Sequence, residues 1–404
     1  MKIQAFTTVP GLFLLFLFAG CDGDGRETAG RETGETGARV VDNSIHVMSG
    51  DEGTIPVAVE WNEDMPACLE SNGSLIPVQA EQLENGRTLL WMLAETSPVE
   101  ERVYDPVSEG ICTGGSWRWE TAGGNRMQLL SDGIPVIEYV YPVYNSDNVE
   151  ETKKPYHHVF SPDGARHITK GVGGRYSHHR GIFFGYNRVR FNDRELDIWH
   201  AEDGERPEHA SINHEWTGPV FGGQEVIILW KDRVGDPFAE EVRRLRVFRR
   251  SDSATMIDIR TVLTSLAGTV ELDGDLQHAG VQFRAAQYVS DNMEQSQFLR
   301  PEGWEEYPVD EEMGDPEQYT DLPWNAFRFF VDGEPYTVGY FSHPDNPQGA
   351  EMSERLYGRF GEFVPAVIDE ENPLVLRYRL YITGGHETDR EEMEREYAIY
   401  RATP

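Results

Sequence analysis

The sequence has few positive charges and little that could cross a membrane. After residue 21 it has no run approaching the roughly 20 apolar residues that a membrane helix needs. Five of its 404 residues are lysines, and 36 Lys and Arg stand against 70 Asp and Glu, a formal net charge of −34. This charge repels polyanions, which argues against nucleic acid and anionic membrane surfaces as partners. Hydrophobic residues still make up 39%, enough for a sizeable core.

Motifs of several well-known enzyme classes are also absent. The serine hydrolase elbow Gly-x-Ser-x-Gly and the Gly-Lys-Ser/Thr end of a P-loop do not occur. His214-Glu215 lacks the second histidine of a His-Glu-x-x-His zinc motif, and Tyr176 stands where a dinucleotide-binding loop would have its third glycine. The residues alone therefore assign no metal and no cofactor.

The first 21 residues resemble an export signal. Lys2 is followed by a short apolar run and then by Gly20-Cys21. The run is too short to span a bilayer, and small residues directly before a cysteine are typical of a bacterial lipoprotein processing site. We expect residues 1–20 to be the signal peptide, Cys21 to carry lipid, and residues 21–43 to be a flexible tether. The protein would then be lipid-anchored in the cell envelope, periplasmic or surface-exposed; the alternative is an ordinary secretory signal.

Two cysteines remain for the folded part. In an oxidising compartment, a single pair such as Cys68 and Cys112 usually forms a disulfide. Two free buried thiols are the alternative.

From about residue 44 the chain is typical of β structure. Short alternating or apolar runs are separated by turn signals such as Asn72-Gly73 and Asp332-Gly333. In 374–382, leucines, a tyrosine and an isoleucine alternate with other residues, among them Arg377 and Arg379, as in an antiparallel strand buried on one face. We predict a mainly β protein, with a small N-terminal β region over 44–120 and an antiparallel β-sandwich over 121–404. Thr388 to Glu391 has the spacing of a capping box and predicts a short C-terminal helix.

Eight of the twelve histidines fall between residues 157 and 214, and the overlapping window 153–200 is locally basic. At its centre, glycines bracket His178-His179-Arg180. Two histidines can transfer protons near neutral pH, and an arginine can fix an anionic ligand with two hydrogen bonds. Alternatively, they bind a divalent metal together with His214 or His278, or they only satisfy backbone groups in loops.

Other segments carry candidate ligand-binding side chains. Flat aromatic rings beside planar polar groups suit sugars, which present an apolar face and a hydroxyl edge. For Trp199, packing in the core is the alternative. These candidates are Trp199, His214, His278, Arg284, His343 and Asn346.

Two blocks resemble a known family. Ser177-His178-His179-Arg180-Gly181-Ile182-Phe183-Phe184-Gly185 and His343-Pro344-Asp345-Asn346-Pro347 are similar to signature blocks of the bacterial family labelled methane oxygenase PmoA. The resemblance covers most of 45–400. It implies a secreted or lipid-anchored protein of a polysaccharide-degrading bacterium, with an antiparallel sandwich like that of the galactose mutarotase group. A methane monooxygenase subunit would be expected to have membrane helices or a strong copper motif, and the sequence shows neither.

We therefore expect an exported lipoprotein that binds or modifies a carbohydrate, or another small polar and even anionic ligand, and that meets the membrane only through its lipid. As an enzyme it would use His179 and His278 as acid and base. The alternatives are a metal-dependent enzyme using the histidines and a non-catalytic glycan-binding lipoprotein. The residues expected to bind the substrate are His178, Arg180, Trp199, His214, Arg284, His343 and Asn346.

Overall fold

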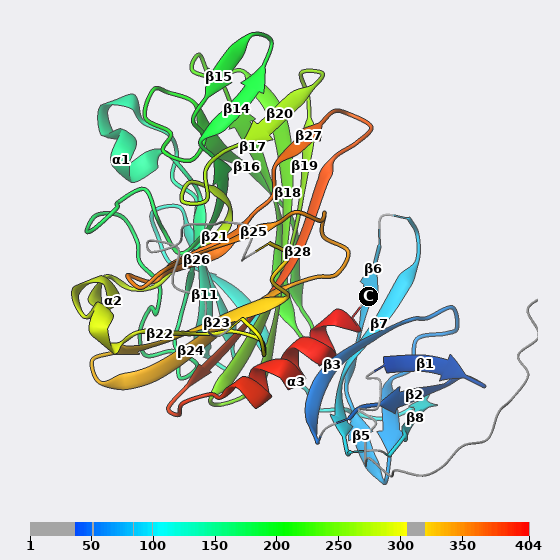
Figure 1. The fold of residues 1–404 in the computed structure, drawn as a ribbon. Coiled ribbons are helices and arrows are strands. Elements are labelled where there is room, and N and C mark those ends of the chain that lie inside the picture. The colour runs from blue at the N-terminus through cyan, green and yellow to red at the C-terminus, as the bar shows by residue number, and fades with distance from the viewer. Residues whose placement is uncertain (1–36, 51, 84, 99, 305–319, 404) are drawn as a thin grey trace, which may run out of the picture. The chain divides into compact units, whose positions relative to one another are not determined.

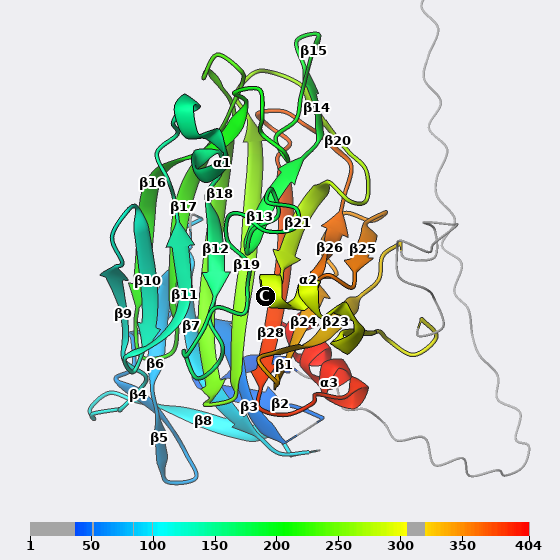
Figure 2. The same ribbon diagram turned by 90° about the vertical axis from the view of Figure 1, so that its left-hand side faces the viewer.

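The computed structural model describes residues 37–403 apart from 51, 84, 99 and 305–319, and Gly34–Pro404 form one compact unit. The predicted signal peptide, Cys21 and most of the predicted tether lie outside the described residues. Two eight-stranded antiparallel sheets, here called the first and second large sheets, pack face to face (Figures 1 and 2). The fold is mainly β, as the sequence predicts. None of the described helices is both long and apolar enough to span a bilayer.

The loops that precede β13 and β21 lie on the outer face of the first large sheet, away from the second sheet. The neighbouring strands β12, β13 and β21 of the first large sheet are visible in Figure 2. Its strands in spatial order are β25 (Glu351–Arg355), β26 (Arg359–Phe363), β21 (Ala279–Arg284), β13 (Ile182–Tyr186), β12 (Tyr156–Val159), β11 (Ile134–Val140), β10 (Arg126–Ser131) and β9 (Trp117–Thr121).

The second large sheet is built from longer strands. In spatial order they are β16 (Arg206–Thr217), β17 (Gly222–Lys231), β18 (Pro237–Ser251), β19 (Ala254–Ser265), β28 (Leu374–Gly384), β24 (Glu334–Ser342), β23 (Trp324–Val331) and β22 (Gln297–Leu299).

The main core lies between these two sheets because alternate residues of each strand point inward. In β28, Leu374, Leu376, Tyr378, Leu380 and Ile382 enter this core, as the period of two predicts. Arg379 points to the other face yet is fully buried, where Asp258 accepts two hydrogen bonds from it at 2.6 and 2.9 Å. A buried arginine is tolerated here because a carboxylate engages it on two sides.

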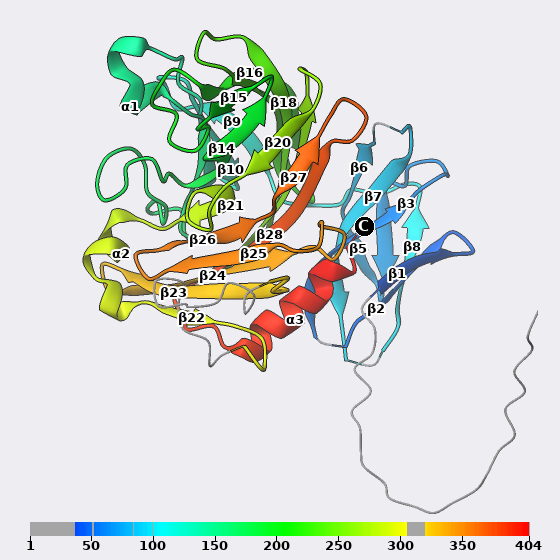
Figure 3. The same cartoon turned by 45° about the horizontal axis from the view of Figure 1, so that its top comes forward.

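Smaller elements complete the sandwich. A four-stranded sheet extends beside it in the order β15 (Arg194–Leu196), β14 (Arg188–Phe191), β20 (Val270–Asp273), β27 (Ala366–Ile368) (Figure 3). The short helices are η1 (Ser146–Asn148), α1 (Val149–Thr152), α2 (Gln287–Asp291) and η2 (Met293–Gln295).

The N-terminal strands form two small sheets. Their orders are β1-β2-β8-β4-β5 and β3-β7-β6. The disulfide between Cys68 and Cys112 joins the start of β4 to the loop after β8. These strands are β1 (Gly37–Val41), β2 (Ser44–Met48), β3 (Gly53–Glu60), β4 (Cys68–Ser71), β5 (Ser74–Ile76), β6 (Val78–Gln82), β7 (Thr88–Thr96) and β8 (Arg102–Val107).

Two predicted boundaries differ from the structure. The tether was predicted to run to residue 43, but β1 pairs with β2 through a tight turn at Asp42-Asn43, where both residues have positive φ. β9 already belongs to the first large sheet, which therefore begins a few residues before the predicted boundary at 121. The division into two domains itself stays a prediction.

The C-terminal helix α3 (Arg390–Arg401) packs against the second large sheet and against the N-terminal strands. Met393 and Tyr400 join a cluster with Phe341 of the second large sheet and Trp91 of β7, and Ile399 packs with the N-terminal strands. The cap is one residue later than the sequence suggests, because Asp389 accepts a hydrogen bond from the Glu392 N–H. Thr388, the predicted cap, is buried and hydrogen-bonded to Thr383.

Candidate functional site

Three histidines from different loops meet on the outer face of the first large sheet. His178 precedes β13, His200 follows β15, and His278 precedes β21. One ring nitrogen of each lies within 4.8 Å of the other two. The ring centroids are 4.5 Å apart for His178 and His200, 4.8 Å for His200 and His278, and 5.9 Å for His178 and His278. Three imidazoles at this separation can share one metal ion.

Two of these histidines are oriented by an aspartate three residues earlier in the chain. Asp197 Oδ2 lies 2.7 Å from His200 Nδ1, and Asp275 Oδ1 lies 2.8 Å from His278 Nδ1. An ionised carboxylate only accepts, so each Nδ1 donates to it, and Nε2 is the nitrogen left to bind a metal. Carboxylates that orient histidines in this way commonly surround metal sites.

Buried lysine and arginine side chains hold the loop that carries His178. Its carbonyl groups from Tyr176 to His179 each accept a hydrogen bond from a buried lysine or arginine. Lys170 donates to Tyr176 and His179, both at 3.3 Å, Arg180 to Ser177 at 3.0 Å, and Lys154 to His178 at 3.2 Å. Lys154 also donates to the carbonyl of Trp199, which links this loop to the segment that carries His200. Because one buried amine donates to both carbonyls, the two segments are held together before any ligand binds.

The same environment favours a neutral His178. Burial, followed by the charges of His200 and Lys154, lowers the pKa of His178 to about 2. Burial also lowers the pKa of Lys170 to about 7 and that of Lys154 well below its usual value. Burial alone would raise the pKa of Asp275, but the hydrogen bond and charge of His278 lower it below its usual value. A neutral His178 is the form that binds a metal.

His179 lies behind the three histidines. It is buried, and neither ring nitrogen has a hydrogen-bond partner among the described residues. Its ring lies parallel to Tyr357 at 6.2 Å and edge-on to Trp199 at 5.6 Å. Burial, followed by Arg359, lowers the pKa of His179 well below its usual value. Tyr176, whose ring centroid lies 6.2 Å from that of His178, remains 43% exposed.

Six of the residues predicted for the site lie together, but three of them make contacts within the protein instead of facing a ligand. The six are His178, His179, His278, Arg180, Trp199 and Arg284. Arg180 is fully buried and donates to Glu150 at 3.0 Å, and Arg284 is fully buried and donates to Ser290 Oγ at 2.5 Å and to the Tyr357 carbonyl. Both were predicted to bind substrate, but two nitrogens of each guanidinium donate to protein groups. Trp199 is also fully buried and packs on Phe183, as the core alternative expected.

The other predicted residues lie elsewhere. His214 is exposed on β16, with its ring 4.5 Å from Trp216. His343 follows β24 and approaches the Thr403 carbonyl at 3.3 Å, and Asn346 hydrogen-bonds the backbone of Arg377. An aromatic neighbour or a rigid loop in the sequence was therefore not enough to predict that these three residues lie near His178.

His200 and the two aspartates were not predicted. The sequence does contain a signal for them, because Asp197-Ile-Trp-His200 and Asp275-Leu-Gln-His278 repeat the same Asp-x-x-His spacing. In both cases the local turn brings the carboxylate to Nδ1 of the histidine.

Comparisons with known proteins identify a family without a known activity. The model of a family of unknown function, DUF6807, matches residues 126–398, which include all three histidines. Its description names no methane oxygenase, so that expectation remains a prediction. No curated protein is similar enough in sequence to match.

Two solved structures share a weak likeness with the chain. One is a glycoside hydrolase family 36 α-galactosidase from Geobacillus stearothermophilus in complex with raffinose, at 9% identity and a TM-score of 0.31; the match covers 72% of this chain and 42% of that one. The other is a GalM/aldose epimerase homologue from C. elegans, at 9% identity and a TM-score of 0.25, covering 68% and 100%. The chain thus spans less than half of the α-galactosidase, and at these TM-scores neither likeness bears on activity.

Proposed function

The chain belongs to DUF6807, a family of unknown function, and we propose that it is a metal-dependent enzyme whose His178, His200 and His278 bind one divalent transition-metal ion. The observation that carries this proposal is the meeting of three ring nitrogens within 4.8 Å, with aspartates on Nδ1 of His200 and His278. Imidazole suits zinc, copper, iron and nickel, and three histidines that leave a further position open are typical of catalytic zinc. A metal-dependent enzyme using the histidines is one of the alternatives that the sequence leaves open.

The partly exposed histidines His200 and His278 leave room for water and substrate. The side chains of His200 and His278 are 24% and 26% exposed, so one side of the centre faces solvent. A bound divalent ion can lower the pKa of a coordinated water to about 7 and polarise a substrate oxygen. The buried guanidinium of Arg359, whose charge acts on His179, adds positive potential behind the histidines, which favours a hydroxide or an anionic substrate group. We infer hydrolysis or another proton-transfer reaction on a polar substrate.

The substrate that we infer is a carbohydrate. What supports it is the exposed ring of Tyr176 beside His178, with the Arg175 guanidinium 5.1 Å from that ring. An exposed aromatic face packs on a sugar ring, and a neighbouring guanidinium binds hydroxyl or carboxylate oxygens. Under this proposal His179 supports the centre from behind through packing.

Elemental analysis of protein purified without an affinity tag tests the metal. We expect close to one equivalent of a transition metal per chain, and a loss of at least tenfold in affinity for zinc in His178→Ala, His200→Ala and His278→Ala. His214→Ala is the matched control, because it removes an exposed histidine from a distant strand. Anomer-exchange and reducing-end assays on a panel of glycans, before and after chelation, then test the reaction. Metal content far below one equivalent, unchanged in the three variants, would contradict the proposal.

The place of action also remains a proposal. We infer that Cys21 is lipidated and that the folded part, held on a tether, stays at the cell envelope; the support is the small-residue pair before Cys21 and the short apolar run before it. Expression of the whole chain with Cys21→Ser should move the protein from the membrane fraction to the soluble fraction. An unchanged distribution would contradict lipid anchoring.

A further inference from the structure

Arg175 lies over two tyrosine rings at the edge of the three-histidine centre. Its guanidinium carbon is 5.1 Å from the ring centroid of Tyr176 and 5.2 Å from that of Tyr357. The Tyr176 ring centroid lies in turn 6.2 Å from that of His178. Contact with two aromatic faces holds a guanidinium in place without using its N–H donors. An exposed ring and an exposed guanidinium thus stand beside a proposed metal ligand.

The backbone that presents these two side chains is held in an unusual conformation. Tyr176 has a φ of +54°, a left-handed value that is a genuine outlier for a bulky side chain. The Tyr176 carbonyl accepts hydrogen bonds from Lys170 Nζ at 3.3 Å and from the His179 N–H at 3.0 Å. The Arg175 N–H donates to Gln287 Oε1 at 3.0 Å, which ties the loop to α2. Such conformations cost about 1–3 kcal/mol and gather at functional sites, where they hold side chains in place for a ligand.

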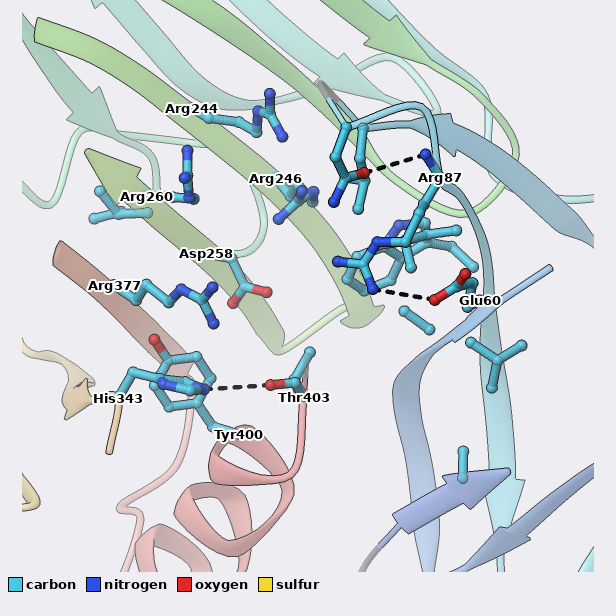
Figure 4. Close-up of a pocket in the computed structure, with 18 of the residues that line it drawn as sticks. Glu60, Arg87, Arg244, Arg246, Asp258, Arg260, His343, Arg377, Tyr400 and Thr403 are labelled. Carbon is cyan, nitrogen blue, oxygen red and sulfur yellow. Dashed lines mark hydrogen bonds and ion pairs between the residues drawn. The ribbon is translucent and has the colours of Figure 1, made fainter. Parts of the chain in front are cut away.

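Arginines at a cavity elsewhere in the molecule are balanced by carboxylates. This cavity, of about 610 Å³, lies between the outer face of the second large sheet and the N-terminal strands β3 and β7 (Figure 4). Arg244 pairs there with Glu225 and with Glu81, and Arg377 pairs with Asp345 at 3.3 Å. These arginines therefore do not indicate an anionic ligand.

Arg175 has no such carboxylate partner among the described residues. Its Nη1 lies 3.5 Å from Met293 Sδ, which is a weak acceptor. Asp291, an acid on the neighbouring helix α2, instead accepts from Gln287 Nε2 at 2.9 Å. The guanidinium therefore keeps N–H donors for a ligand, in a chain whose 70 acidic residues outnumber its 36 basic ones.

A second arginine adds positive charge behind this surface. Arg284 is fully buried, with its guanidinium carbon 5.0 Å from the centroid of the Tyr357 ring. It donates to two backbone carbonyls and to Ser290 Oγ, which are neutral acceptors. Burial, followed by the charges of Arg359 and Arg175, lowers the pKa of Arg284 to about 10, so this side chain stays charged at neutral pH. Its charge favours an anionic group bound beside Arg175.

We propose that Arg175 and Tyr176 select a uronic acid, a sugar that carries a carboxylate, as the substrate of the histidine centre. The Tyr176 ring packs on the sugar, and the Arg175 guanidinium binds the carboxylate with two hydrogen bonds. Because the Tyr176 ring lies between Arg175 and His178, another oxygen of the same or the adjoining sugar reaches the metal. This inference rests on the proposed function and narrows its substrate from a carbohydrate in general to an acidic one.

Isothermal titration of the whole protein, incubated with zinc, tests the preference for an acid. The ligands are disaccharides of galacturonate, glucuronate, mannuronate and guluronate, each compared with its dimethyl ester, which keeps the rings and hydroxyls but has no charge. We expect at least one acid to bind at least tenfold more tightly than its ester. Arg175→Gln should remove this difference by weakening the acid alone. Arg175→Lys should keep part of it, because an ammonium retains the charge but not the paired geometry. Arg118→Gln, at a half-exposed position on β9, is the control and should keep the wild-type preference.

Two results would overturn the proposal: no uronate binds more tightly than its ester, or Arg175→Gln keeps the wild-type preference. Zinc content, measured in the same samples, separates this proposal from the metal centre. One equivalent of zinc without a preference for an acid overturns the substrate class alone. A preference that depends on Arg175 in protein without zinc overturns the metal centre and leaves the acid-binding surface standing.

Discussion

Asp275 and His278 form a turn in which a carboxylate oxygen lies 2.8 Å from Nδ1 of the imidazole three residues later. The neighbouring Asn187 donates to the other oxygen of Asp275 at 2.9 Å, so the carboxylate is itself held. The Asp197–His200 pair repeats the arrangement from another loop. Two histidines are thus set in the same tautomer by separate aspartates.

We predict that Asp275→Asn and Asp197→Asn each weaken zinc binding by about 10–100-fold, because an amide orients the imidazole less well and no longer raises its basicity. Competition titration with a chromogenic chelator measures the change. Asp193→Asn, at an exposed turn with positive φ, is the control and should bind zinc normally. Wild-type affinity in both aspartate variants would mean that these pairs have no part in metal binding.

Trp199→Ala should destabilise the protein by about 3–5 kcal/mol, because it removes a fully buried indole from contact with Phe183 and His179. Urea unfolding measures the loss, and Trp199→Phe should recover much of it. A Trp199→Ala variant with wild-type stability but without sugar binding would instead support the substrate contact that the sequence suggested.

Glu362 lies buried between the large sheets, and burial raises its pKa to about 7. The folded state therefore holds a proton that the unfolded state releases near its ordinary pKa of 4.5. This stabilisation is complete below pH 4.5 and is lost as pH rises through 7, with a total of roughly 3 kcal/mol.

Glu362→Gln should remove this dependence, because a neutral amide can replace the protonated acid. Urea unfolding at pH 5 and pH 8 should show that wild-type stability falls relative to the variant at the higher pH. Glu334→Gln, at an exposed position on β24, is the comparison. A constant difference between wild type and Glu362→Gln at both pH values would contradict the raised pKa.

Strands and helices that show a local residue pattern could be predicted from the sequence. Side-chain positions that depend on contacts with residues far away in the sequence could not. The alternation in 374–382 predicts β28, and the pattern after Thr388 predicts α3 to within one or two residues. His200 was missed because its position near His178 depends on a backbone contact between Trp199 and Tyr186 and on the side chain of Lys154. Arg284 was assigned to a ligand because it lies with His278 around the start of a strand. Its partner, the Tyr357 carbonyl, lies 73 residues away in sequence.

Loss of the disulfide between Cys68 and Cys112 should cost about 4 kcal/mol, because it closes a loop with a sequence separation of 44 and restricts the unfolded chain. Cys68→Ser/Cys112→Ser, compared with the oxidised wild type by urea unfolding, measures this. Treating the wild type with reductant should reproduce the loss, and the variant should not respond to reductant. The metal centre lies on another sheet, so zinc stoichiometry at low temperature should be unchanged.

Gly181, next to the His178-His179-Arg180 segment, provides the sharpest steric test of the histidine loop. Its φ is +47°, and a Cβ there would lie 2.0 Å from the His157 carbonyl oxygen, whereas Gly173 has a φ of +83° and nothing within 4 Å of a Cβ. Gly173→Ala should therefore cost about 1–2 kcal/mol through its backbone conformation alone. Gly181→Ala adds a clash with backbone, which cannot rotate away, and should cost roughly 3 kcal/mol or more.

The clash also predicts an effect on metal binding. The Gly181 N–H donates to the Lys170 carbonyl and its own carbonyl accepts from Arg284, both at 2.8 Å, so relief of the clash must displace the residues that precede it. Zinc affinity should fall in Gly181→Ala and remain near wild type in Gly173→Ala, at a temperature where both are folded by circular dichroism. Equal zinc affinity in the two variants would show that the position of His178 is not set by the backbone at Gly181.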